Sequence, residues 1–375
     1  MKKQILIFIM ATATAFLLIS CQKKEVPEAP PIVEEPKPVE KKPEPEPEPK
    51  KEETREGMRK SYTTGEWIDE KIGVKRPIAI MLGNTIDAVP QFGISQADIV
   101  YEVPVEGAYT RLMAIFQDIT GLDKIGSVRS CRHYFIYFER EFDAIYAHFG
   151  QAVYAKPVLE RADVNNLNGE SIESISFYRD SSRKSPHNAF TSEEGIEKGI
   201  EHYEYRRDYN ENYSGHYLFA DDEEEVTLLK GEDALFVSPG YFVNKPWFVY
   251  DKETGLYNRF QYKDKHIDGA TEEQLTVSNI IIQYCSWKNM DENGYLDINT
   301  MSGGDGKYIT KGKMIDVTWA KDNEDSPARY FDQDGEEITI NQGKTWVCVV
   351  RDTYKERTGI YKTEKELTEA RAADQ

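Results

Sequence analysis

The sequence contains little cysteine and no surplus of positive charge. Four cysteines occur in 375 residues, and 66 acidic residues outnumber 47 lysines and arginines, so the formal net charge is -19. A chain this acidic is unsuited to nucleic acid and to broad adhesion on anionic lipid, because like charges repel. Any anion would need a local basic pocket. The cysteines and histidines show no zinc-type spacing, and we expect neither a metal ion nor a cofactor.

The scarcity of cysteine also excludes a disulfide framework. Cys21 ends the N-terminal apolar run, and the others, Cys131, Cys285 and Cys348, are scattered along the chain. Disulfide-stabilised exported domains instead carry an even and closely spaced set. Cys285 and Cys348 lie in strand-like apolar runs and are the better candidates for a single bond. Three buried free thiols are the interpretation that we favour.

The first residues predict export and a lipid anchor. Two lysines precede an apolar run, Ile5–Ile19, which is shorter than the about 20 residues of a transmembrane helix and typical of a signal peptide. The run ends in Leu18-Ile19-Ser20-Cys21, which resembles a bacterial lipoprotein box. We expect residues 1–20 to be removed and Cys21 to carry lipid; an uncleaved anchor helix is the alternative. The protein would then face the cell wall from the outer face of the cytoplasmic membrane.

The composition changes twice more along the chain. Residues 21–57 are rich in proline, glutamate and lysine, which keep the backbone hydrated and build no core, so they predict a disordered linker. The expected folded parts are a mixed α/β N-terminal domain at 58–223 and a β-rich C-terminal domain at 224–358. A charged helical tail is expected at 359–375.

Apolar runs and helical periodicity predict an α+β fold. Continuous apolar runs at 78–82, 99–103 and 144–149 are typical of buried strands. Aromatic residues at three-and-four spacing predict a helix that begins around Ser127–Ser130 and continues to about residue 142, and residues 151–169 also look helical. From about residue 224, short strand candidates alternate with turns rich in glycine and asparagine, which indicates a mostly antiparallel sheet.

Basic residues in the N-terminal half give the main candidate ligand-binding site. Arginine presents a planar fork of donors that suits phosphate or carboxylate, and a helix N-terminus adds free backbone N–H groups. Arg129 and Arg132 are three residues apart and are expected on one side of the first helical turn. The alternative is internal pairing with Glu102, Glu106 and Asp143, and the sequence leaves both open. The candidates are Arg111, Arg129, Arg132, Arg179, Arg183 and Asn188.

Acid–base catalysis has only weak candidates. His187 lies in a polar loop before a helix, and His148 ends a strand-like run, so either imidazole is a candidate acid or base. Glu102 or Glu106 would be the partner. The ordinary structural roles are a core histidine for His148 and a loop-capping residue for His187.

Six segments of the N-terminal half resemble, in order, the YerB-like lipoprotein family of Gram-positive bacteria. The later segments GGDGKYITKGKMIDVTW and GKTWVCVV resemble the C-terminal domain of that family. The resemblance implies a lipid-anchored envelope protein with two domains of unknown function, and it brings no catalytic residues. Cys131-Arg132-His133 departs from the commoner Ala-Arg-Pro. The six segments are RPIAIMLGN, SQADIVYE, VEGAYTRLMAIFQ, KIGSVRSCRHYF, DAIYAHFG and SPHNAFTS.

These observations leave three hypotheses for function. The leading one is an envelope protein that binds an anionic ligand, such as a cell-wall glycan, or a wall-synthesis protein through an arginine-rich pocket. The second is an enzyme acting on a phosphate-bearing or peptidoglycan substrate with a histidine and a glutamate as acid and base. The third is a structural interaction module whose arginines are all internally paired.

Overall fold

The computed structural model describes residues 54–373. The expected signal peptide, the lipidated Cys21 and nearly all of the linker lie outside these residues and stay predictions. Among residues 54–373, no helix is both long and apolar enough to cross a bilayer.

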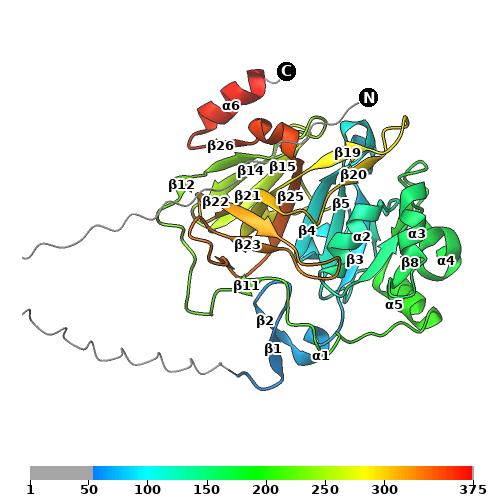
Figure 1. Ribbon diagram of the computed structural model, residues 1–375. Helices are drawn as coiled ribbons and strands as arrows, with labels where there is room; N and C mark the ends of the chain where they lie inside the picture. The colour runs from blue at the N-terminus through cyan, green and yellow to red at the C-terminus, as the bar shows by residue number, and fades with distance from the viewer. Residues whose placement is uncertain (1–53, 374–375) are drawn as a thin grey trace, which may run out of the picture. The chain divides into compact units, whose positions relative to one another are not determined.

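A mixed sheet is the centre of the described part of the chain (Figure 1). Its order is β12-β22-β21-β18-β25-β4-β5-β3-β7-β8, with β23 paired to β22. The pairs β18–β25, β25–β4, β3–β7 and β7–β8 are parallel, and the remaining pairs are antiparallel. The strands are β3 (Ile78–Gly83), β4 (Ile99–Pro104), β5 (Thr110–Phe116), β7 (Ile145–His148), β8 (Asn166–Asn168), β12 (Glu232–Asp233), β18 (Asn279–Cys285), β21 (Gly304–Thr310), β22 (Lys313–Ala320), β23 (Arg329–Phe331) and β25 (Thr345–Arg351).

Both faces of this sheet are covered, which explains why its inner strands are continuous apolar runs. On one face, Ile80 of β3 packs in a core that includes α4 (Gly169–Ser176), α5 (Glu193–His202) and a second sheet. On the other face, Met81 packs in a core with α2 (His133–Arg140) and α3 (Lys156–Leu159). Neighbouring residues of a strand point to opposite faces, so one strand supplies both cores.

The second sheet is antiparallel and belongs to the C-terminal half. Its order is β16-β15-β14-β13-β26, and β17 pairs with β15. The strands are β13 (Phe236–Ser238), β14 (Trp247–Asp251), β15 (Leu256–Gln261), β16 (Asp264–Lys265), β17 (Thr276–Val277) and β26 (Gly359–Tyr361). Helix α6 (Glu364–Ala373) follows β26.

Short elements complete the described structure. They include three 3-10 turns at 86–88, 106–108 and 153–155. The others that Figure 1 labels, or that the site uses, are α1 (Glu70–Gly73), β1 (Met58–Lys60) paired with β2 (Trp67–Asp69), β6 (Ile125–Gly126), β9 (Tyr178–Arg179) and β10 (Ala189–Thr191) in one small sheet, β11 (Leu218–Phe219) paired with β24 (Thr339–Ile340), and β19 (Trp287–Asn289) paired with β20 (Leu296–Ile298).

The predicted α+β class is confirmed, with a mixed N-terminal part and mostly antiparallel pairing in the C-terminal part. The large sheet runs across the expected boundary at residue 224, because β25 pairs with β18 on one side and with β4 on the other. Cys131, Cys285 and Cys348 are free and buried, as we favoured.

Two local predictions are wrong. Residues 151–169 form a 3-10 turn, the four-residue α3 and strand β8 rather than one helix. Helix α2 begins at His133 with Arg132 as its N-cap, so Arg129 precedes the helix instead of lying in its first turn. The cause is pairing with β3: Val128 bridges Leu82, and the Arg129 backbone N–H donates to the Met81 carbonyl.

Candidate functional site

Three of the predicted arginines come together beside the sheet. We call Arg111, Arg129 and Arg132 the arginine cluster. Arg111 is on β5, Arg129 is in the extended segment after β6, and Arg132 caps α2. All three side chains are partly buried. They lie close enough for the charges of Arg129 and Arg132 to act on Arg111, and for the charge of Arg132 to act on Arg129.

Among the described residues, only one member of the arginine cluster has an acidic partner. Arg132 forms a bidentate ion pair with Glu106, with Nε–Oε1 and Nη2–Oε2 distances of 2.8 and 2.6 Å. Arg111 donates to the Ser130 carbonyl at 2.5 Å, and Arg129 donates to the Pro186 carbonyl at 2.7 Å. Within residues 54–373, no carboxylate lies within ion-pair distance of either of these two guanidinium groups.

The electrostatics of the cluster reflect this shortage of acid. Burial, together with the charges of Arg132 and Arg129, lowers the pKa of Arg111 to about 9, so Arg111 still carries its charge at pH 7. Burial and the charge of Arg132 also lower the pKa of Arg129. For Arg132, burial is outweighed by hydrogen bonds and charge from Glu106, which raise its pKa. The cluster therefore holds three positive charges against one negative charge.

The other predicted ligand-binding residues form hydrogen bonds or ion pairs with other parts of the protein. Arg183 donates to the carbonyls of Ala88 and Pro90 at 2.8 and 2.5 Å. Arg179 is exposed, pairs with Glu173 at 2.7 Å and donates to Asn188 Oδ1 at 3.1 Å. The described contacts do not join these three predicted residues to the arginine cluster.

Of the two candidate histidines, only His187 lies beside the cluster. Its Nδ1 is 3.5 Å from Arg129 Nη1. Burial and the charge of Arg129 lower the pKa of His187, although Asp87 opposes the shift. His148 is buried, with Nδ1 2.9 Å from the Gly150 carbonyl and Nε2 3.2 Å from Asn166 Oδ1. Burial lowers the pKa of His148 to about 4, so it is a neutral core histidine at pH 7.

Glu102 lies on the opposite face of the sheet from Arg111. In the β4–β5 pair, Glu102 is opposite Leu112 and Val103 is opposite Arg111. Residues directly opposite each other share a face, and neighbours along a strand do not. Glu102 is fully buried and pairs with Arg259 of β15 at 2.7 Å. Of the predicted acids, Glu106 alone is therefore brought to the arginine cluster.

Two aromatic residues at the site were missed. Tyr295 has the Arg132 guanidinium 5.8 Å from its ring centroid, and Tyr154 packs edge-on against Tyr295 with centroids 5.6 Å apart. Stacking of guanidinium on aromatic rings holds an arginine in place without using its outer donors. Tyr295 is far from Arg132 in sequence and carries no local signal of this contact. Residues 54–373 contain no group of three or more His, Cys, Asp or Glu placed to hold a metal ion.

Comparisons with known proteins give the family. Residues 63–206 and 237–347 match the N-terminal and C-terminal domains of a family described as "Protein of unknown function (DUF3048)". A relative from Bacillus subtilis (strain 168), "Putative lipoprotein YerB", is 30% identical over 349 residues, which cover 90% of this chain and 92% of the relative. The chain belongs to the DUF3048 family. The resemblance seen in the sequence segments is thereby confirmed.

A solved structure supports the DUF3048 fold described above. The crystal structure of the YerB protein from Bacillus subtilis has a TM-score of 0.72 and 30% identity to this chain. The match covers 81% of this chain and 99% of that protein. The family description assigns no activity, so the function of this DUF3048 protein must be argued from its own residues.

Proposed function

We propose that this DUF3048 protein is a lipid-anchored protein of the cell envelope whose arginine cluster binds an anionic ligand. The lipoprotein-like box at Cys21 and the lipoprotein name of the Bacillus subtilis relative support the anchor. The ligand is a phosphate- or carboxylate-bearing component of the envelope. The observation that carries the binding proposal is that Arg111 and Arg129 are partly buried and have no acidic partner among residues 54–373.

Burial of a charged group without a counterion costs free energy. Glu106 neutralises one of the three guanidinium groups, and burial together with the positive charge of neighbouring arginines lowers the pKa of the other two. Each arginine has five N–H donors, and the carbonyls of Ser130 and Pro186 each accept from a single Nη1. An anion would supply the missing negative charge and accept the donors that remain.

The test is a thermal-unfolding titration of the folded unit, residues 53–375, with sodium pyrophosphate and with sodium phosphate. We expect the midpoint to rise with ligand concentration, because a ligand that binds only the native state stabilises it by about 2.7 kcal/mol at 100 times its Kd. Arg111→Met and Arg129→Ala should each abolish the rise. Arg161→Ala is the matched control, since Arg161 lies outside the cluster and pairs with Asp163 and Glu324.

The unliganded variants separate binding from a structural role. Arg111→Met removes an uncompensated charge and nearly conserves volume, so its midpoint without ligand should equal or exceed that of the wild type. If the cluster is purely structural, the same substitution lowers the midpoint by several degrees and no anion raises the wild-type midpoint. A rise that persists in both cluster variants would place the anion elsewhere and refute the proposal.

A further inference from the structure

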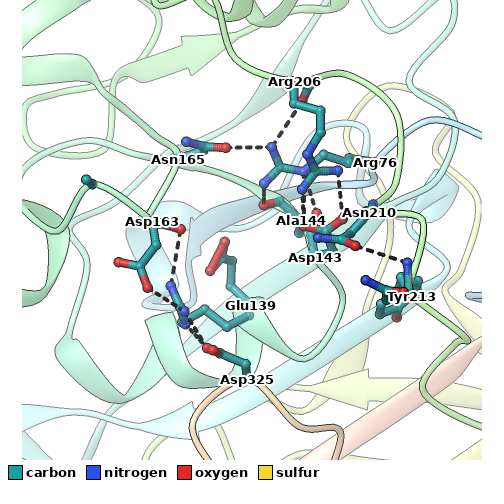
Figure 2. Close-up of a pocket in the computed structure, with 13 residues that line it drawn as sticks. Arg76, Glu139, Asp143, Ala144, Asp163, Asn165, Arg206, Asn210, Tyr213 and Asp325 are labelled. Atoms are coloured by element: carbon teal, nitrogen blue, oxygen red, sulfur yellow. Dashed lines mark hydrogen bonds and ion pairs between the residues drawn. The ribbon is translucent and has the colours of Figure 1, made fainter.

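A hollow lies at the other end of α2, away from the N-cap that carries Arg132. It is an open cavity of about 550 Å³, drawn in Figure 2. Arg140 of α2 pairs there with Asp163 at 2.8 Å and also with Asp325. Arg206 pairs with Asp143 at 2.6 Å. The cavity is assembled from segments that are distant in sequence.

The cationic groups of this cavity are already satisfied by the protein. Arg76 donates to Asn165 Oδ1 at 2.6 Å, to the Ala144 carbonyl at 2.7 Å and to two further carbonyls. With Arg140 and Arg206 it makes three positive charges, against three from Asp143, Asp163 and Asp325. The charged wall is therefore neutral, and no cation in it is left to attract an anion.

Glu139 is the exception in the cavity. The residue is 2% exposed, and its carboxyl group has no hydrogen bond or ion pair with any residue in the described range. Figure 2 shows this carboxyl group between Asp325 and the Arg76 contacts, with no interaction drawn to it. Nine in ten buried polar groups have a partner. A buried carboxyl group that faces a cavity without one is therefore suited to a ligand.

The protonation state of Glu139 limits the kind of ligand. Burial raises its pKa to about 8; Arg76 and Arg140 act in the opposite direction, and Asp143 and Asp325 act in the same one. At pH 7 the group is mostly a neutral carboxylic acid, which both donates and accepts a hydrogen bond. A cation would be repelled by Arg76 and Arg140, and an anion would meet the three aspartates.

Free amide donors lie in the same cavity. Asn165 uses its Oδ1 for Arg76, and Asn210 uses its Oδ1 for the Asn212 backbone N–H. The Nδ2 groups of Asn165 and Asn210 have no partner among residues 54–373. We propose that this cavity binds an uncharged, saccharide-sized molecule rich in hydroxyl or amide groups, which exchanges hydrogen bonds with the Glu139 carboxyl group and these amides. A volume of this size is in the range of small-molecule sites, about 300–1,000 Å³.

The experiment is calorimetric titration of residues 53–375 with two uncharged probes, the disaccharide of N-acetylglucosamine and maltose, at pH 6.5 and pH 9. Glu139→Gln keeps one donor and one acceptor in the same shape, whereas Glu139→Ala removes both. We expect at least one probe to bind the wild type and Glu139→Gln at pH 6.5, and Glu139→Ala to bind at least tenfold more weakly.

The comparison between pH 6.5 and pH 9 shows whether the neutral carboxylic acid of Glu139 contacts the ligand or Glu139 is merely structural. At pH 9 about nine-tenths of Glu139 would be ionised, so wild-type affinity should fall about tenfold, while Glu139→Gln should not change. The other charged side chains of the cavity are Arg76, Arg140, Arg206, Asp143, Asp163 and Asp325. A hydrogen bond from Arg161 lowers the pKa of Asp163, and burial raises the pKa of Tyr213 well above its ordinary value, so neither of these two groups titrates between pH 6.5 and pH 9. Failure of both probes to bind the wild type, or an equal pH effect in Glu139→Gln, would overturn the proposal. This outcome is independent of the pyrophosphate titration, which concerns other residues.

Discussion

Replacement of Glu102 by glutamine should test how far a single buried ion pair holds the two halves of the sequence together. Glu102 is in the N-terminal half, and its partner Arg259 is 157 residues away; both side chains are fully buried. Oε1 of Glu102 accepts from Asn84, Thr110 and Asn244 at 2.7–3.1 Å. Glutamine retains that oxygen, so these hydrogen bonds survive the substitution.

The expected loss of stability arises at the other carboxylate oxygen, Oε2. Oε2 of Glu102 accepts from Arg259 at 2.7 Å and from Trp346 Nε1 at 3.2 Å. In Glu102→Gln an NH₂ group faces these donors and Arg259 becomes an uncompensated buried charge, which costs about 3–5 kcal/mol. The entropy of unfolding is about 2.1 cal/mol/K per residue, or about 0.7 kcal/mol/K for about 320 folded residues. A loss of about 4 kcal/mol then lowers the Tm by about 6 °C.

Differential scanning calorimetry of Glu102→Gln, Arg259→Met and the double variant would measure this loss. Glu102→Gln should lose about 6 °C, and Glu102→Gln with Arg259→Met should regain most of it, because the double variant no longer buries a lone charge. Pyrophosphate binding should be unchanged in the double variant, since Glu102 and Arg111 point to opposite faces. A single variant within about 1 °C of the wild type, or a double variant that loses as much as the sum of the singles, would refute the reasoning.

Two further predictions concern stability. Burial raises the pKa of Glu139 to about 8 in the folded protein, against an ordinary value of 4.5. The folded protein therefore loses no stability through Glu139 below pH 4.5 and loses stability as the pH rises from 4.5 to 8, where only the unfolded chain is ionised. Glu139→Gln should be more stable than the wild type by about 3 kcal/mol at pH 7 but not at pH 4. Urea unfolding at both pH values measures this, and equal stabilities at pH 7 would contradict it. Gly65→Ala should lose more than about 2 kcal/mol, because φ is +72° and a Cβ would lie 2.4 Å from Phe219 Cγ. Gly294→Ala, with φ +77° and no atom within 4 Å, should lose only about 1 kcal/mol in the same urea assay.

The parts of the fold that the sequence predicts best are those where one local signal decides the structure. Strands β3, β4 and β7 are continuous apolar runs because the sheet is covered on both faces. The start of α2 was misplaced because Val128 and Arg129 pair with β3, a contact that no local pattern encodes. Residues 151–169 were misassigned for a similar reason, since β8 forms by pairing with β7.

The candidate sites show the same limit. The cluster of Arg111, Arg129 and Arg132 could be predicted as a group because its members are close in sequence. That Glu106 rather than Glu102 lies beside them depends on the register of β4 and β5, which the turn between the strands sets. The cavity around Glu139 was not predicted, because its walls come from segments as distant as Arg76 and Asp325.

The position of β25 has a consequence for how the chain acquires its structure. β25 lies between β18 and β4, with Thr345 opposite Ile99, so the middle of the large sheet joins residues from nearly the two ends of the folded part. Such high contact order makes folding slow, because a long loop must close before the contacts that reward it form. A chain truncated before residue 345 would leave β4 and β18 as open, apolar edges prone to aggregation. The sheet therefore makes completion of the polypeptide a condition for its solubility.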